Sequence, residues 1–182
     1  MRLRAVVLGA AGAAAVVAAI ALGVTWRPLG TAATGPPRSA PDFVGIERWL
    51  NSEPLTMQAL RGKVVLVEFW TFACSNCVRM LPHVSGWQRE YAERGLVVVG
   101  VHTPETDFEQ MGEQLERALA RHQITYPIAQ DNAYATWRAW DNHYWPALYL
   151  VDRKGKIAFS HFGEGDTETI EAAIRRLLDE SA

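Results

Sequence analysis

Cysteine is scarce in this chain: Cys74 and Cys77 are the only two among its 182 residues. A pair with two residues between its members closes too small a loop to stabilise a fold much through chain entropy. A structural zinc site would need a second pair of cysteines or histidines at ligand spacing, and the sequence offers none. The scarcity therefore argues against a disulfide scaffold or a metal site and favours thiol exchange at this single pair.

Basic charge is also scarce in most of the chain. The formal net charge is −2, and the first forty residues contain four arginines and no acidic residue. The remaining 142 residues therefore carry a net charge of −6. A body this acidic lacks the basic surface that nucleic-acid binding needs, so no nucleic-acid partner is expected. With 49% apolar residues, the chain has enough material for an ordinary buried core.

A long uncharged run lies near the amino terminus. Arg2 and Arg4 precede residues 5–25, which are twenty-one residues without a charge. Cleaved signal peptides have apolar stretches of about 7–15 residues, whereas spanning a bilayer takes about 20. We therefore expect residues 1–26 to form a signal anchor, with a cleaved signal peptide and a secreted product as the alternative. The positive flank places the rest of the chain on the extracytoplasmic side of the cell membrane.

Residues 27–41 differ in composition from the rest of the chain. They are rich in proline and glycine, which is typical of a flexible linker. The folded domain is expected to occupy residues 42–182, a length that suits one domain.

Strand-like and helix-like segments alternate within this domain. Apolar runs at 63–70 and 96–101 are typical of buried strands, and a helical pattern at 74–93 separates them. A hairpin is expected at 147–162, around a tight turn that contains Gly155. The order of these segments predicts an α/β sandwich.

Weaker patterns complete the expected secondary structure. Residues 43–50 suggest an edge strand or turn, 55–60 a helical turn, 128–129 a short strand and 132–140 a short aromatic helix. Asp166 is expected to cap the last helix.

Thr106 and Glu109 have the spacing of a capping box. The helix behind this box is expected to bury an apolar stripe made of Phe108, Met111, Leu115 and Leu119.

The two cysteines lie where the first buried strand gives way to a helix. Thiol exchange requires a thiolate, and a free cysteine with a pKa of about 8.5 is mostly protonated at neutral pH. A helix amino terminus presents free N–H groups and a positive dipole end, both of which favour the anion. Cys74 is therefore the predicted nucleophile, and Cys77, one turn later, the resolving thiol. A redox-active Cys74–Cys77 disulfide would then be the only cofactor, with no metal.

The residues around this pair resemble the thioredoxin-like superfamily. Glu68 lies six residues before Cys74 and is followed by Phe-Trp, and Pro82 lies five residues after Cys77. Pro146 matches the family's cis-proline. The segments Phe-Trp-Thr-x-x-Cys-x-Asn-Cys and Tyr-Pro-Ile-Ala-x-Asp-Asn are similar to membrane-anchored TlpA/ResA/CcmG-type thiol–disulfide oxidoreductases, in particular to the extracytoplasmic domain of DipZ-type proteins.

This resemblance extends over about residues 42–180. It implies a thioredoxin-like sandwich, in which a central mixed β-sheet has helices on both faces and an N-terminal membrane-anchor helix precedes the domain.

The resemblance also assigns roles to residues. Glu68, desolvated in an apolar strand, would have a raised pKa and shuttle the proton of Cys77. Trp70 would pack beneath the site, and Pro82 would kink the helix. Apart from the resemblance, His102 follows the second buried strand, which leaves two expectations: an imidazolium near the sulfurs that stabilises a thiolate, or an ordinary structural or surface histidine. The expected substrate-binding residues are Ser75, Asn76, Tyr144, Trp145 and Pro146.

Three functions remain open. The first is a reductase-like oxidoreductase that exchanges disulfides with exported proteins, for example in cytochrome c maturation, with a membrane electron donor as a second partner. The second is a peroxiredoxin-type thiol peroxidase, because Thr71 and Cys74 form Thr-x-x-Cys, although Val67 stands where that family has proline. The third is a thiol-dependent metal or copper carrier, which the small number of thiols disfavours.

Overall fold

The computed structural model of this chain describes residues 38–180. The expected anchor at 1–26 and all but the last four residues of the expected linker lie outside this described part. Within residues 38–180, we find no helix with the length and apolar character needed to cross a membrane.

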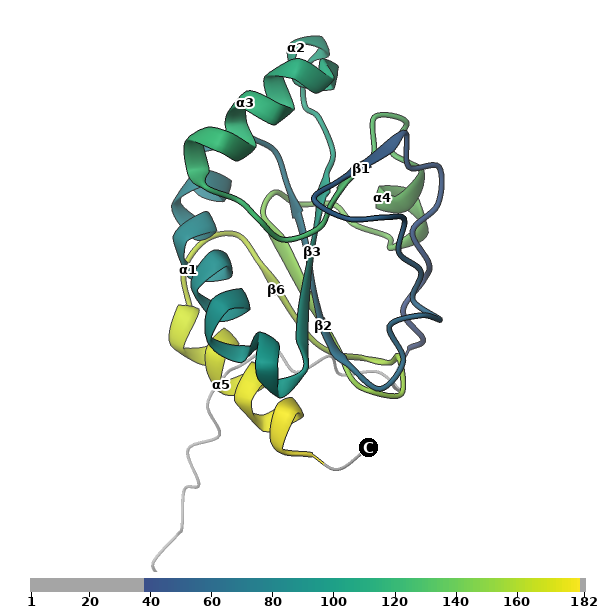
Figure 1. Cartoon of the computed structure of the whole chain (residues 1–182), viewed down its shortest axis with the longest axis vertical. Coiled ribbons are helices and arrows are strands. Elements are labelled where there is room, and N and C mark those ends of the chain that lie inside the picture. Colours follow the sequence, from purple (N-terminus) through teal and green to yellow (C-terminus); the bar gives the residue numbers. More distant parts are fainter. Residues whose placement is uncertain (1–37, 181–182) are drawn as a thin grey trace, which may run out of the picture.

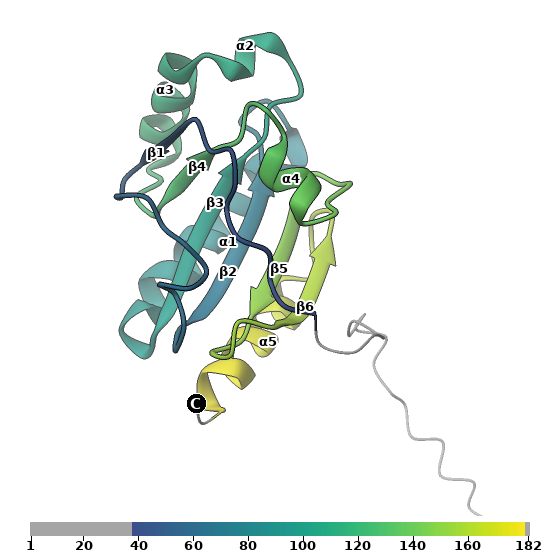
Figure 2. The same cartoon turned by 90° about the vertical axis from the view of Figure 1, so that its right-hand side faces the viewer.

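A six-stranded sheet forms the centre of the domain, in the order β1-β4-β3-β2-β5-β6 (Figure 2). The parallel pairs are β2 with β3 and β3 with β4, and the other three pairs are antiparallel. The predicted mixed sheet is therefore confirmed. The strands are β1 (Arg48–Leu50), β2 (Val64–Trp70), β3 (Leu96–His102), β4 (Ile128–Gln130), β5 (Ala147–Val151) and β6 (Ile157–Phe162).

Helices cover both faces of the sheet. Helices α1, α3 and α5 lie on one face, and α4 lies on the other with the irregular segment that precedes β2 (Figure 1). The helices are α1 (Ser75–Tyr91), the 3₁₀ turn η1 (Ala92–Arg94), α2 (Asp107–Gln110), α3 (Gly112–His122), α4 (Ala135–Ala139) and α5 (Thr167–Asp179).

Strand β2 is buried along its whole length, because its side chains alternate between two cores. Leu66 and Trp70 pack with the residues of α1, α3 and α5. Val65, Val67 and Phe69 belong to the core on the opposite face. Burial on both faces explains why the strand reads as a continuous apolar run in the sequence.

The helix expected behind the capping box is interrupted. Both reciprocal contacts of the box are present at Thr106 and Glu109, as predicted. Met111, however, has extended backbone (φ −70°, ψ 113°), which separates α2 from α3 and ends the helical period. As a result, Phe108 and Met111 are 55% and 50% exposed, so their expected burial is wrong, whereas Leu115 is buried.

One other expected detail differs in the structure. Asp166 precedes α5 in the left-handed region (φ 48°), and its side chain makes no capping hydrogen bond, so the predicted side-chain cap is wrong. Its backbone oxygen accepts from Ile170 instead. The expected helical turn at 55–60 is present, because the N–H of Leu60 donates to the carbonyl oxygen of Thr56 at 3.2 Å. The tight turn at Gly155 has the positive φ (72°) that the sequence predicts.

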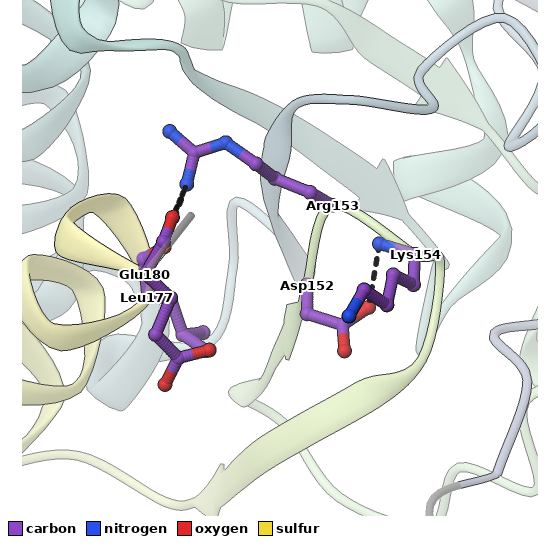
Figure 3. Close-up of a pocket in the computed structure, with 5 residues that line it drawn as sticks. All are labelled: Asp152, Arg153, Lys154, Leu177 and Glu180. Carbon is purple, nitrogen blue, oxygen red and sulfur yellow. Dashed lines mark hydrogen bonds between the residues drawn. The ribbon is translucent and has the colours of Figure 1, made fainter. Parts of the chain in front are cut away.

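Arg153 supports the carboxyl end of α5 from the turn after β5 (Figure 3). Its guanidinium donates to the carbonyl oxygens of Leu177 (2.8 Å) and Glu180 (2.9 Å), which the helix itself leaves without partners. A small pocket lies beside this contact. Since Val151 pairs with Val65, the pocket lies at the end of the sheet opposite to the cysteines.

Candidate functional site

Cys74 lies at the start of α1, in the short loop after β2. It is the N-cap residue, with extended backbone (φ −75°, ψ 112°), and its sulfur accepts from the backbone N–H of Cys77 at 3.4 Å. The Cys74 side chain is partly exposed, whereas Cys77 is buried. An accessible sulfur therefore receives a helix-terminal N–H group, as predicted. Both cysteines are free thiols in this structure, so the Cys74–Cys77 disulfide stays a prediction.

Cys77 is placed to keep its proton while Cys74 reacts. Burial raises the pKa of the Cys77 thiol, and its hydrogen bond to Cys74 raises it further. A backbone hydrogen bond to Thr71 offsets part of this rise. For Cys77 to attack in its turn, another group has to accept its proton.

Glu68 is the candidate for that group. Its side chain has no exposed surface, and burial raises its pKa to about 8, against a smaller lowering by the hydroxyl of Tyr126. That hydroxyl donates to Glu68 Oε2 at 3.2 Å. Glu68 lies two residues before Trp70 in β2, so it shares the sheet face of Trp70 and the core that contains Cys77. The predicted buried carboxyl is confirmed, while its role as a proton shuttle stays a prediction.

Tyr126 is a site residue to which the sequence analysis assigned no role. Its only signal there was its place as the first residue of the motif Tyr-Pro-Ile-Ala-x-Asp-Asn. Its contact with Glu68 joins residues 58 positions apart, so it depends on the packing of the fold.

Pro146 lies at the same end of β2 as the cysteines. Ala147, the next residue, pairs with Phe69, close to the point where β2 leads into the Cys74 loop. The Trp145–Pro146 peptide bond is cis, as predicted. The indole N–H of Trp145 donates to the backbone carbonyl oxygen of Thr103 at 3.0 Å. The ring centroids of Trp145 and Trp137 lie 4.1 Å apart.

The other predicted substrate-binding residues have different surroundings. Tyr144 is 55% exposed, and Ser75 is exposed at the first position of α1. Asn76 is partly exposed, and its Oδ1 accepts from Arg79 at 2.5 Å. Arg79 also pairs with Glu164, so the oxygen of Asn76 is held by an existing contact. The role of these residues in binding a substrate stays a prediction.

Trp70 and Pro82 lie where the sequence places them. Trp70 is fully buried at the end of β2, in the same core as Cys77. Pro82 lies inside α1, one turn beyond the cysteine pair.

His102 corrects one expectation. It is fully buried at the end of β3, where it pairs with Trp70, and its ring stacks on Phe72 at 5.3 Å. Burial lowers the pKa of His102 to about 4, so the side chain is neutral at neutral pH. The expected imidazolium is therefore wrong, and the alternative expectation of a structural histidine is confirmed. The sequence pattern placed this residue after a strand but did not reveal that aromatic rings enclose it.

Comparison with known proteins agrees with this geometry. The model of the AhpC/TSA family matches residues 37–160. Protein DipZ of Mycobacterium tuberculosis is 47% identical over 146 residues, which cover 79% of this chain and 21% of that protein. Thiol-disulfide oxidoreductase YkuV of Bacillus subtilis is 30% identical over 141 residues, or 78% of this chain and 95% of YkuV. The chain thus spans about a fifth of the DipZ relatives.

Solved structures of thioredoxin-like proteins share this fold. A thioredoxin-like protein in its oxidized form superposes with a TM-score of 0.73 and 31% identity, covering 80% of this chain and 98% of that one. A thiol-disulfide isomerase from Corynebacterium glutamicum reaches a TM-score of 0.65 at 28% identity, covering 78% and 98%. Fold and site together define a thiol–disulfide oxidoreductase of the thioredoxin-like superfamily. Within it, the chain belongs to the AhpC/TSA family.

Proposed function

We propose that this oxidoreductase reduces disulfides of exported proteins through Cys74 and Cys77. The observation that carries the proposal is the asymmetry of the pair. Cys74 is partly exposed and receives an N–H group at the start of α1, whereas Cys77 is buried beneath it with a raised thiol pKa. This asymmetry gives one sulfur for attack and one for resolution.

The proposed reaction has two exchange steps. The Cys74 thiolate attacks one sulfur of a client disulfide, forming a mixed disulfide and releasing the client's other sulfur as a thiolate, which takes up a proton. Cys77 then loses its proton and attacks Cys74, which releases the second client thiol and leaves a Cys74–Cys77 disulfide. Two electrons pass to the client. A membrane electron donor with its own dithiol would reduce the pair again.

Glu68 would accept the proton of Cys77. A group with a pKa of about 8 gains and loses protons readily near neutral pH, which suits general acid–base work. Its carboxyl also lies close enough for its charge to raise the pKa of Cys77. Deprotonation of Cys77 and protonation of Glu68 are therefore coupled events.

The client would lie along the exposed rim of the cysteine loop. Ser75 and Tyr144 are exposed there and Asn76 and Trp145 are partly exposed, whereas Pro146 is buried. The proposed location, outside the cytoplasm on an anchor at residues 1–26, is supported by the uncharged run and its two preceding arginines.

A thiol peroxidase is the second candidate, because the chain belongs to the AhpC/TSA family and has Thr71 three residues before Cys74. The hydroxyl of Thr71, however, donates to Glu109, which leaves no hydroxyl proton for the sulfur or a peroxide. Stopped-flow mixing with micromolar hydrogen peroxide tests this candidate. Slow formation of a sulfenic acid on Cys74 is expected, and rapid formation would favour the peroxidase.

Insulin reduction by dithiothreitol tests the main proposal. The full chain should accelerate it, and Cys74→Ala should return the rate to that without protein, because the attacking thiol is lost. His83→Ala, an exposed change on the same helix, is the matched control and should retain the wild-type rate. Undiminished activity of Cys74→Ala would overturn the proposal.

A further inference from the structure

Glu109 is a buried carboxylate with an unusually complete set of donors. It has no exposed surface, although α2 is only four residues long. Its Oε2 accepts from the backbone of Glu105 (2.9 Å) and from both the backbone (2.9 Å) and the hydroxyl (3.1 Å) of Thr106. Its Oε1 accepts from the hydroxyl of Thr71 and from the backbone N–H of Ala73 (3.2 Å).

The two oxygens of Glu109 serve different parts of the chain. A capping box requires the glutamate to reach back to the N-cap backbone, so α2 accounts for Oε2. Oε1 does not contribute to α2. Both of its donors belong to the loop between β2 and α1, just before Cys74. Glu109 therefore links the cysteine loop to the segment after β3.

The donors keep Glu109 ionised. Burial by itself would raise the pKa of this carboxyl, but the hydrogen bonds from Thr71, Thr106, Ala73 and Glu105 outweigh burial and hold the pKa below its ordinary value. Charge-assisted hydrogen bonds are about twice as strong as neutral ones. The contacts with the cysteine loop are therefore strong ones at any pH where thiol exchange proceeds.

The bond to Glu109 fixes the direction of the Thr71 hydroxyl, and the tautomer of His102 follows from it. His102 Nε2 lies 3.2 Å from Thr71 Oγ1, and the single hydroxyl proton of Thr71 is used in the bond to Glu109. Nε2 must therefore carry the proton and donate, which defines the tautomer of the neutral ring. A directed chain results, from His102 to Thr71 to Glu109.

We propose that Glu109 is a positioning residue of the thiol site, acting through Thr71 and Ala73 to fix the loop that holds Cys74. The fixed loop keeps the Cys74 sulfur where the N–H of Cys77 reaches it. This inference rests on the proposed function in one respect, that Cys74 is the attacking thiol. It adds a residue that acts on the reacting sulfur from outside the Cys-x-x-Cys segment.

Two valine variants separate positioning from simple stabilisation. Thr71→Val removes a hydroxyl donor of Oε1, and Thr106→Val removes a hydroxyl donor of Oε2 on the same carboxylate. Both keep a β-branched side chain of similar shape. A purely structural Glu109 would make both variants less stable and leave the thiol chemistry of both unchanged.

The experiment measures the pH profile of Cys74 alkylation by iodoacetamide in the reduced full chain. We expect Thr71→Val to react at least about threefold more slowly at pH 7, because the thiolate of Cys74 is then less well stabilised by the N–H of Cys77. Thr106→Val should follow the wild-type profile. Thr71→Ser retains the hydroxyl and should restore the wild-type rate.

A wild-type profile for Thr71→Val would overturn the proposal. Hydrogen exchange in the wild-type protein gives an independent test that does not require the variant to fold. The Ala73 amide should be protected as strongly as amides within β2, and exchange at the rate of an open loop would contradict the proposal. Cys74→Ala keeps the two claims apart. If Cys74→Ala reduces insulin at the wild-type rate, the proposed function is contradicted. If Cys74→Ala is inactive but Thr71→Val keeps the wild-type alkylation profile, only the proposed role of Glu109 is contradicted.

Discussion

Glu68 lies in a strand whose other six residues are apolar, with no surface exposed to water. Ionising a carboxyl there is costly, so burial raises its pKa to about 8 from an ordinary value of 4.5. Between these two pH values the folded protein holds a proton that the unfolded chain releases. The free energy of unfolding that depends on protonated Glu68 is thus fully present below about pH 4.5, and it is lost as the pH rises through about 8.

Glu68→Gln should remove this pH dependence. The variant is expected to gain stability over the wild type by about 1.4 kcal/mol for each pH unit between about 4.5 and 8. Urea unfolding at pH 5, 6.5 and 8 measures the difference. A constant difference across this range would show that Glu68 does not have the raised pKa.

Tyr126 should influence the chemistry through Glu68. Its hydroxyl donates to the carboxylate and so lowers the pKa of Glu68. Tyr126→Phe removes that bond, and we expect the pH dependence of the second exchange step to move to higher pH. The measurement is the release of a client thiol from a preformed mixed disulfide at several pH values.

Tyr149→Phe is the matched control for this change. Its hydroxyl donates to Asn142 at 3.0 Å, and its ring packs in the core on the other face of the sheet. Tyr149→Phe should lower the free energy of unfolding by an amount similar to that of Tyr126→Phe, and it should leave the pH profile of the second exchange step unchanged. An unshifted profile for Tyr126→Phe would separate Tyr126 from proton transfer.

The individual site residues differ in how far their surroundings could be predicted from the sequence. The burial of Glu68 was predictable, because apolar residues precede and follow it in the sequence, and a strand of this kind is covered on both faces. The charge state of His102 was not, because it depends on Trp70 and Phe72 enclosing the ring. The site contacts of Glu109 were likewise invisible, since its spacing to Thr106 already had a complete local explanation.

At the scale of single elements, strand β3 contains a glycine whose backbone is approached closely by neighbouring side chains. A Cβ at Gly100 would lie 2.6 Å from Ile128 Cδ1 and 2.9 Å from Trp70 Nε1. Gly100 thus lets Trp70 fill the space beneath the cysteine loop.

Gly100→Ala should destabilise the protein by about 1–3 kcal/mol through overpacking. Gly86→Ala is the control, because Gly86 lies within α1 and a Cβ there meets nothing within 4 Å. The control should stabilise the protein by about 0.5–1 kcal/mol, since glycine is a poor helix former. Urea midpoints measure both changes, and equal stability of Gly100→Ala and the wild type would refute the packing argument.

Element positions followed from the sequence better than element ends. The strands β2 and β3 and the helix α1 were predictable from long apolar or periodic runs. The break at Met111 was not, because the apolar spacing from Phe108 to Leu119 is compatible with an uninterrupted helix. A single extended residue changed which side chains are exposed.

At the scale of the whole molecule, the sheet order brings the site together. β2 lies between β3 and β5, so the loops after β2 and β3 and the Trp145–Pro146 segment before β5 meet at one end of the sheet (Figure 2). Cys74 comes from the loop after β2, Pro146 from the segment before β5, and His102 from the end of β3 itself. The sequence analysis assigned both Cys74 and Pro146 to the predicted site, whereas the contacts of Tyr126 and Glu109 required the folded chain.

Trapping of the mixed disulfide tests the central claim most directly. Full-length Cys77→Ser, mixed with excess of a peptide that contains one disulfide, should form a stable one-to-one adduct through Cys74, visible as added mass. Wild-type protein should instead release the reduced peptide and end with its two cysteines joined. Absence of an adduct with Cys77→Ser, or an equal adduct with Cys74→Ser, would contradict the account.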